Sequence, residues 1–365
     1  MTTFSDIDLP QLPAPTVVEL LDFEQIFESM RDQLSGLQPL LFTAQGEPAL
    51  FNAVRHTSDN GEVYFKVPAT TDELIYLQLD SDPSVKLLQI VAYRELLLRQ
   101  RVNEAARSTM LAFATGPDLD HEAARFGVER LVINPGDESA IPPVTPVYES
   151  DNALRRRAQL ALEGYSTAGP IGAYAYHALS ASAQIKSVDI AAPAFARLSL
   201  TSEQSAVLPA DATAIKVVDD VGLPDPKPGD VAITVLALEG DGTASQTILD
   251  AVSDTLNDDA VRPLTDRPRV RSAEIVPYTL HAVLTLHSGP DPGIVRQAAV
   301  DAITAYVADA HRIAQPPTFP GFYRALKQPG VYDVELIQPT DAIALEAWQA
   351  AYCTSITVTV GGIYG

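Results

Sequence analysis

The sequence predicts a multi-domain protein of the α+β class, and three observations support this. The chain has 365 residues, which is more than one ordinary hydrophobic core accommodates, so two or more packed units are expected. Its first third carries long stretches with apolar residues at helical spacing. Its last third alternates short strand patterns with helices. Hydrophobic residues make up 46% and charged residues 20%, a composition typical of a chain that buries a core.

Four segments follow from these patterns. Residues 1–45 form an N-terminal arm and a bundle helix, and residues 46–145 form a long-helix domain. The proline-rich stretch NPGDESAIPPVTPVYES is typical of a connector between units. Residues 146–230 form a central helical and β domain with a variable insertion, and residues 231–365 form a C-terminal α+β domain.

The first helix is predicted in VVELLDFEQIFESMRDQLSGL, where apolar residues recur at steps of 3 and 4. Such a stripe is typical of an amphipathic helix that packs on its own domain, or of one that joins a bundle with another chain. Because the stripe lies near a terminus, we expect it to pack poorly in the isolated chain and to become buried on assembly. The stripe and its interface candidates are Leu20, Phe23, Phe27, Met30 and Leu34, followed by Leu37.

The strongest helical pattern runs from about Lys86 to Ala114, about 42 Å if it is continuous. Arg94 and Arg101 lie on its apolar stripe, seven residues apart, and both are interface candidates. An unpaired buried charge is costly, so either this face is partly in water or a partner supplies carboxylates. A shorter helix is expected in DLDHEAARFG. The stripe of the long helix comprises Leu87, Ile90, Val91, Leu97, Leu98, Val102, Ala105 and Ala112.

The stretch EGYSTAGPIGAYAYHALS raises the question of nucleophilic catalysis, because Ser166 and His177 lie within it. The local pattern favours architecture. A helix capped by Ser150 or Asp151 ends at Gly164, which is expected to be left-handed, and a turn then leads into a second helix at Gly169. We expect His177 to point away from the buried face of that helix, with no acidic residue nearby to orient it. The expected face comprises Ile171, Tyr174, Ala175, Ala178 and Leu179.

No catalytic, cofactor-binding or metal-binding set is predicted. The motif H-E-x-x-H fails because Arg125 stands where the second histidine would be, and no Lys follows a glycine loop in the manner of a phosphate loop. Cys353 is the single cysteine, which excludes an intrachain disulfide and a thiolate zinc cluster and fits folding in a reducing cytoplasm. We therefore expect neither a cofactor nor a metal.

The net charge of −22 would repel a phosphate backbone or an anionic bilayer, so neither nucleic acid nor a membrane is an expected partner. The N-terminal sequence lacks the features of a secretion signal, and no run of 18 apolar residues occurs.

Strands are expected in EVYFKVP, ELIYLQL and IKSVDIAAP, and residues 194–229 are expected to form variable loops or a small β insertion. Beyond them, DVAITVLALEG, EIVPYTLHAVLTLH, PGVYDVELIQP and TSITVTVGG are predicted strands. Helices are predicted in ASQTILDAVSDTLN and in the stretch that Asp291 caps. This order is typical of a two-layer α/β sandwich of ferredoxin-like type.

With these elements placed, the chain resembles the baseplate J-like family of contractile phage tails and related bacteriocin particles. The resemblance rests on stretches that occur in one order along most of the chain. They are LPAPTVVELLDFEQIFESM, AYRELLLRQRVNEAARSTMLAFATGPDLDHEAARFGVER, ESDNALRRRAQLALEGYSTAGPIGAYAYHALSA, VRPLTDRPRV and LKQPGVYDVELIQP.

The resemblance implies a non-enzymatic wedge protein that forms an iris-like ring around the central spike hub. It implies two copies per wedge, or twelve per baseplate, with a smaller wedge partner and a sheath-initiator protein as neighbours. The location would be the baseplate of a virion tail or tailocin, assembled in the bacterial cytoplasm. Two other functions stay open: a serine-type hydrolase acting at Ser166 with His177, and a free cytoplasmic binding module.

Overall fold

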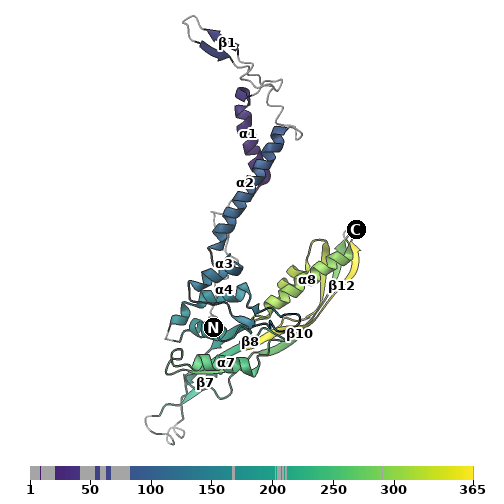
Figure 1. The fold of residues 1–365 in the computed structure, drawn as a ribbon. Coiled ribbons are helices and arrows are strands. Elements are labelled where there is room, and N and C mark those ends of the chain that lie inside the picture. Colours follow the sequence, from purple (N-terminus) through teal and green to yellow (C-terminus); the bar gives the residue numbers. More distant parts are fainter. Residues whose placement is uncertain are drawn as a thin grey trace. The chain divides into compact units, whose positions relative to one another are not determined.

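The computed structural model describes residues 21–41, 54–57, 63–66, 83–166, 169–201, 212–289 and 291–364, with the single residues 9, 203, 207 and 209. The chain divides into two compact units, one within residues 7–118 and one built from residues 119–365. Helices and strands occur together, which confirms the α+β class (Figure 1). The predicted strand ELIYLQL lies outside the described residues.

The first unit is built on two helices, α1 (Phe23–Leu41) and α2 (Pro83–Ser108), with a hairpin of β1 (Val54–Thr57) and β2 (Val63–Lys66). The helices pack through Ile26 and Phe27 of α1, which are 5% and 7% exposed. The expectation that the helix around Phe23 and Phe27 packs poorly in the isolated chain is therefore wrong for Phe27, whereas Phe23 is only partly buried. Leu20 and the side chains of Leu34 and Leu37 lie outside the described residues.

The long helix ends at Ser108, six residues before the predicted end at Ala114. Hydroxyl groups account for the difference, because Ser108 Oγ donates to Ala105 O and Thr109 Oγ1 donates to Ala106 O. These side chains offer the last carbonyls an alternative to the next helical turn. The chain then continues in tight turns to the shorter helix α3 (Gly116–Ala124).

The second unit begins with short elements between residues 119 and 181. The proline-rich connector contains a small hairpin of β3 (Val132–Asn134) and β4 (Val147–Tyr148). Helix α4 (Asp151–Leu160) has the predicted cap, because Ser150 Oγ accepts from Ala153 N at 3.3 Å. A 3-10 turn, η3 (Glu163–Tyr165), leads to α5 (Ile171–Ala181).

A first three-stranded sheet has the order β5-β8-β9. Its strands are β5 (Ile185–Ala191), β8 (Asp230–Ala237) and β9 (Arg267–Ser272), with β5 antiparallel and β9 parallel to β8. Helices α5 and α7 (Gln246–Asn257) pack on it and bury Ile233, Val252 and Leu256 completely. A second hairpin of this unit, β6 (Ala194–Arg197) with β7 (Ile215–Asp219), lies within the stretch where variable loops or a small β insertion were expected.

A second three-stranded sheet has the order β11-β10-β12. Its strands are β10 (Glu274–His287), β11 (Val331–Gln338) and β12 (Gln349–Tyr364), with β11 antiparallel and β12 parallel to β10. Helices α8 (Pro292–Ala310) and α9 (Phe319–Leu326) form a second layer that packs on this sheet. Helix α8 lies along β10 and β12 (Figure 1). Alternate residues of β10 face the helices and are buried: Leu280, Ala282, Leu284 and Leu286.

The strands predicted for one ferredoxin-like sandwich are divided between these two sheets. Only Ala273 separates β9 from β10, so one extended segment serves the first sheet and then the second. Hydrogen bonding continues across this junction, since Ala273 N donates to Val235 O and Glu274 N donates to Trp348 O. Strand β8 with α7 therefore belongs to the first sheet, and β10, β11 and β12 belong to the second.

Candidate assembly interface

The turn that contains Ser166 is held by backbone contacts. His177 Nε2 lies 3.1 Å from Gly164 O, and Ser166 N donates to Glu163 O. Because a carbonyl oxygen only accepts, Nε2 carries the proton and cannot also remove one from a serine. The imidazole therefore ties α5 to η3, and the geometry is that of a brace.

Gly164 does not end α4 in a left-handed conformation as predicted, because it lies within η3. Its lack of a side chain serves a close approach, since a Cβ there would lie 2.3 Å from Tyr176 Cδ1. Four of the five residues predicted for the buried face of α5 are buried, and Ile171 is 42% exposed instead. This stretch packs two helices closely together.

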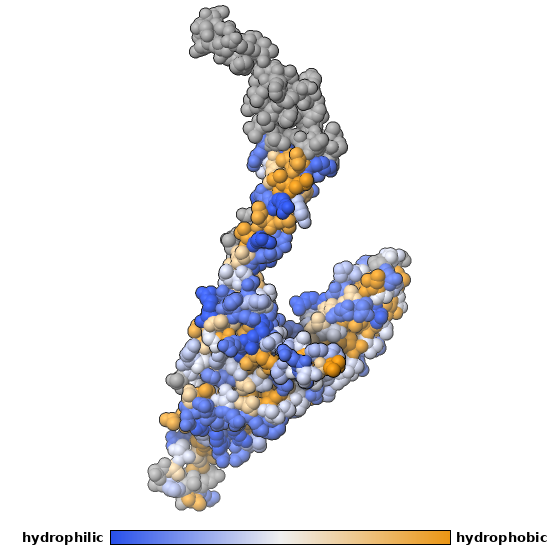
Figure 2. All heavy atoms as spheres, in the orientation of Figure 1, coloured by the Kyte–Doolittle hydropathy of each residue, from blue (hydrophilic) through white to orange (hydrophobic). Residues whose placement is uncertain are grey.

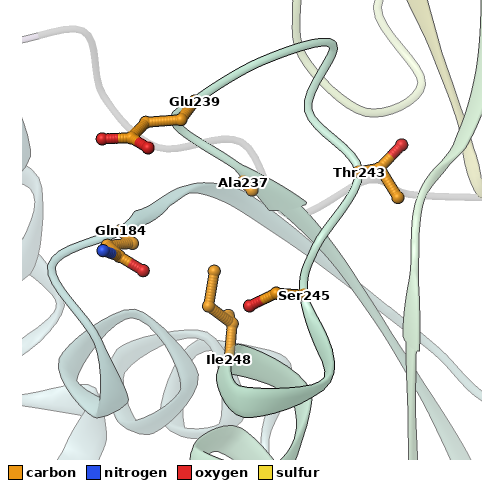
Figure 3. A pocket seen from close by; sticks show the side chains of 6 residues that line it. All are labelled: Gln184, Ala237, Glu239, Thr243, Ser245 and Ile248. Carbon is orange, nitrogen blue, oxygen red and sulfur yellow. The ribbon is translucent and has the colours of Figure 1, made fainter.

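A small pocket lies beside the N-terminus of α7 (Figure 3). Its volume is 160 Å³, below the roughly 300 Å³ at which ligand sites begin. Glu239 is its one titratable lining residue, and no histidine, lysine or cysteine lines it. Its size and polarity suit a few water molecules. The lining residues are Gln184, Ala237, Glu239, Thr243, Ser245 and Ile248.

Across the described residues, no group of three or more His, Cys, Asp or Glu side chains could hold a metal ion. Within the described helices, none is both long and apolar enough to cross a membrane.

Helix α2 has two apolar faces. One packs on α1 through Val85, Leu88, Ala92 and Leu96. The other is exposed, with Leu87 at 64%, Ile90 at 60% and Leu98 at 66%. A turn of about 100° per residue puts these sets on opposite sides of the helix. We call the exposed set the outer face of α2. Figure 2 shows apolar side chains gathered on this helical pair. The outer face comprises Leu87, Ile90, Val91, Arg94, Leu97, Leu98, Arg101 and Val102.

Arg94 and Arg101 are both exposed on the outer face, so neither charge is buried in the single chain, as both alternatives expected. The neighbouring carboxylate of Glu95 is bound elsewhere, since Arg99 Nε donates to it at 2.9 Å. The sequence pattern predicted this outer face but not the face of α2 that packs on α1. The signal was present, because Val85, Leu88, Ala92 and Leu96 also follow helical spacing.

The β3–β4 hairpin carries a second exposed apolar set. Ile141 is 99% exposed and Tyr148 is 51% exposed, and both lie on or beside this hairpin. Scattered apolar residues are ordinary on protein surfaces, but a concentrated group is typical of an interaction site. The set comprises Val132, Ile141, Val144, Val147 and Tyr148.

Exposed apolar faces of this kind are typical of a structural building block of a multi-chain assembly. The comparisons with known proteins agree. Residues 80–137 match the baseplate J-like N-terminal domain, and residues 278–359 match the baseplate J-like protein C-terminal domain. Over 356 residues the chain is 39% identical to baseplate protein J of Escherichia phage P2, covering 98% of each sequence.

The chain belongs to the baseplate J-like family, which confirms the resemblance found in the sequence. It is a structural protein of the virion tail baseplate and not an enzyme. Ser166 and His177 are accordingly parts of the architecture.

Proposed function

We propose that the chain is the wedge protein of a contractile phage tail or tailocin baseplate. Two copies per wedge, twelve per baseplate, form an iris-like ring around the central spike hub. A smaller wedge partner and a sheath-initiator protein are the other neighbours. Assembly takes place in the cytoplasm of the bacterial host.

The outer face of α2 is the observation that carries this proposal. Its three most exposed apolar residues, Leu87, Ile90 and Leu98, stand at 60% exposure or more. Covering the exposed part of one such side chain stabilises a docked state by about 1–2 kcal/mol. An apolar stripe opposite a packed helix is what a further bundle helix requires. We therefore assign this face to the wedge partner.

Helix α1 contributes as the inner member of the bundle. Phe27 is buried against α2, so the two helices dock as one preformed pair. Phe23 and Met30 are only partly buried and remain available at the rim of the pair. For Leu20 and Leu34 the assignment rests on sequence spacing alone. In this arrangement α1 and α2 of the first unit supply the bundle, while the domains predicted at 146–230 and 231–365 meet neighbouring wedges.

Arg94 and Arg101 set register and partner choice in this bundle. Their guanidinium groups reach water in the isolated chain, and on docking they need carboxylates from the partner helix. Changing both to Glu should leave the melting temperature of the isolated chain within a few degrees of wild type. Wedge assembly should fall sharply and recover in part when acidic residues of the partner helix are reversed.

The matched test compares Arg101→Glu with Arg107→Glu. Both arginines are exposed on α2, but Arg107 lies outside the outer face. Each variant is co-expressed with the wedge partner, and co-purification is measured. Loss of the complex with Arg101→Glu and its retention with Arg107→Glu supports the proposal. Equal recovery of the partner by both variants would show that the outer face stays solvated in the wedge.

A further inference from the structure

The outer edge of β12 is long and free of charge. The chain has no charged residue after Glu346, although its net charge is −22. Strand β12 is the last strand of its sheet, with β10 on its inner side. Within the described part of the chain, the segment 311–314 covers only the start of the outer edge. There Ala314 N donates to Gln349 O at 2.9 Å, and His311 Nδ1 donates to Ala351 O at 2.7 Å.

Beyond that segment, Ser355–Val360 is the regular part of β12. Register shifts lie after Tyr278 and after Leu284 of β10, and between them Ser355–Val360 forms an uninterrupted ladder with the central strand. Val358 faces the helices and is buried, whereas Ser355, Thr357 and Thr359 are exposed. An edge strand presents unpaired N–H and C=O groups along its length. Residues 356–360, all β-branched and of high strand propensity, therefore offer a template for another strand.

The opposite edge of the same sheet is different. Strand β11 exposes Asp333 and Glu335, and charges of this kind on an edge prevent pairing with other strands. The contrast identifies β12 as the edge of this sheet that is open to a partner.

We propose that two copies of the chain pair through β12, antiparallel about a two-fold axis, so that their second sheets join into one continuous sheet. The paired segment is Ser355–Val360. Opposite residues of an antiparallel pair point to the same face of a sheet, whereas neighbouring residues of one strand point to opposite faces. The two-fold axis must therefore pass through a residue position, either Thr357 or Val358, and not between them. In the first case Thr357 faces its own copy, and in the second it faces Thr359.

Charge favours a second copy as the occupant. Two chains of net charge −22 repel each other over most of their surfaces, and a symmetric contact brings each residue close to its own copy. A contact between copies is therefore least opposed where no charge lies, and Ser355–Val360 meets that condition. Pairing of β12 with β11 of another copy would instead bring Asp333 and Glu335 into a contact where no cation of β12 could pair with them.

The inference deepens the proposed self-association and rests on it, but it concerns a different surface from the outer face of α2. The experiment therefore uses the full chain without the wedge partner. If β12 pairing is wrong, the full chain does not dimerise through this edge, whatever its binding to the wedge partner. If the wedge proposal is wrong, variants of the outer face of α2 still co-purify with the wedge partner, whatever the state of the dimer.

The first measurement is the oligomeric state of the full chain by analytical ultracentrifugation over a concentration series. The wild type should form a dimer, and Thr357→Lys with Thr359→Lys should weaken it by about tenfold or more, because like charges then face each other. Thr285→Lys adds a charge to the central strand, and Thr304→Lys adds one to α8, as controls. Both controls should dimerise as the wild type does.

The second measurement identifies the register by disulfide formation after Cys353→Ser removes the natural thiol. Opposite Cβ atoms in an antiparallel pair lie about 4.5–5.5 Å apart, close to disulfide range. Thr357→Cys should crosslink to itself, or a mixture of Thr357→Cys and Thr359→Cys chains should crosslink to each other. A monomeric wild type, or a dimer that the double lysine variant leaves intact and neither thiol arrangement crosslinks, would overturn the proposal. Lysine substitutions that instead abolish only capture of another baseplate protein would assign the edge to that protein.

Discussion

Arg157 Nη2 lies 3.0 Å from Glu149 Oε1, and the two side chains are 6% and 3% exposed. Leu131 N also donates to Glu149 Oε1, at 2.9 Å. The pair ties α4 to the two residues that flank the β3–β4 hairpin, Leu131 before β3 and Glu149 after β4. Burial raises the pKa of the Glu149 carboxyl, and the Leu131 N–H and Arg157 partly oppose this effect. The exposed apolar hairpin is therefore held on the second unit by a buried ion pair.

Breaking this pair from one side should be more costly than removing both charges. Arg157→Met leaves a buried carboxylate with its main cation gone, and we expect a loss of about 3 kcal/mol in the free energy of unfolding. Adding Glu149→Gln should then cost little more, giving a coupling energy of about 1 kcal/mol or more in urea denaturation. Strictly additive losses would show that the two side chains act independently.

Asp230 should make stability depend on acid. Burial alone would raise the pKa of Asp230, but hydrogen bonds from Arg267, Lys227 N and Arg269 outweigh it and lower the pKa to about 2. A lowered pKa contributes stability that is fully present above the unfolded value of about 3.9 and is lost as the pH falls toward 2.

The variant that isolates this effect is Asp230→Asn. At pH 7 it should be less stable than the wild type by about 2 kcal/mol, because charge-assisted hydrogen bonds are lost. The difference should shrink as the pH falls from about 4 to about 2, since the wild-type carboxylate is then protonated. The exposed Asp301→Asn serves as the control. A difference that stays constant across this range in denaturant midpoints argues against the ion cluster.

Gly321→Ala should destabilise the chain although it lies in a helix. Helix propensity alone predicts a gain of about 1 kcal/mol. A Cβ at Gly321 would lie 1.9 Å from Tyr306 Oη, so α8 and α9 could no longer pack at their present distance. We expect a lower melting temperature, and Gly362→Ala, whose Cβ meets no atom within 4 Å, should change it little. A higher melting temperature for Gly321→Ala means that Tyr306 moves aside without cost.

The brace between α5 and η3 gives a direct test against catalysis. Ser166→Ala with His177→Ala removes the hydrogen bond to Gly164 O and should lower the melting temperature slightly. Particles that carry this variant should assemble and infect normally. Particles that assemble normally but have lost their activity would instead support a hydrolase.

The periodicity of the sequence predicted the helices, strands and helix caps well, because these depend mainly on residues that are close together along the chain. The cap at Ser150, the cap at Asp291 and the alternation along β10 were all found in this way. The division into two sheets was not predicted, because it depends on which distant strand pairs with β8 and which with β10. The face of α2 that packs on α1 was not predicted. Its stripe includes the small residue Ala92, and it lies beside the larger apolar residues of the outer face.

The central claim is that the outer face of α2 is an assembly surface of a baseplate wedge protein. A reconstruction of the intact baseplate, at a resolution that shows side chains, tests it most directly. We predict two copies per wedge, with Leu87, Val91 and Leu98 covered by a helix of another chain and with carboxylates beside Arg94 and Arg101. A baseplate in which this face is open to solvent in both copies would contradict the account.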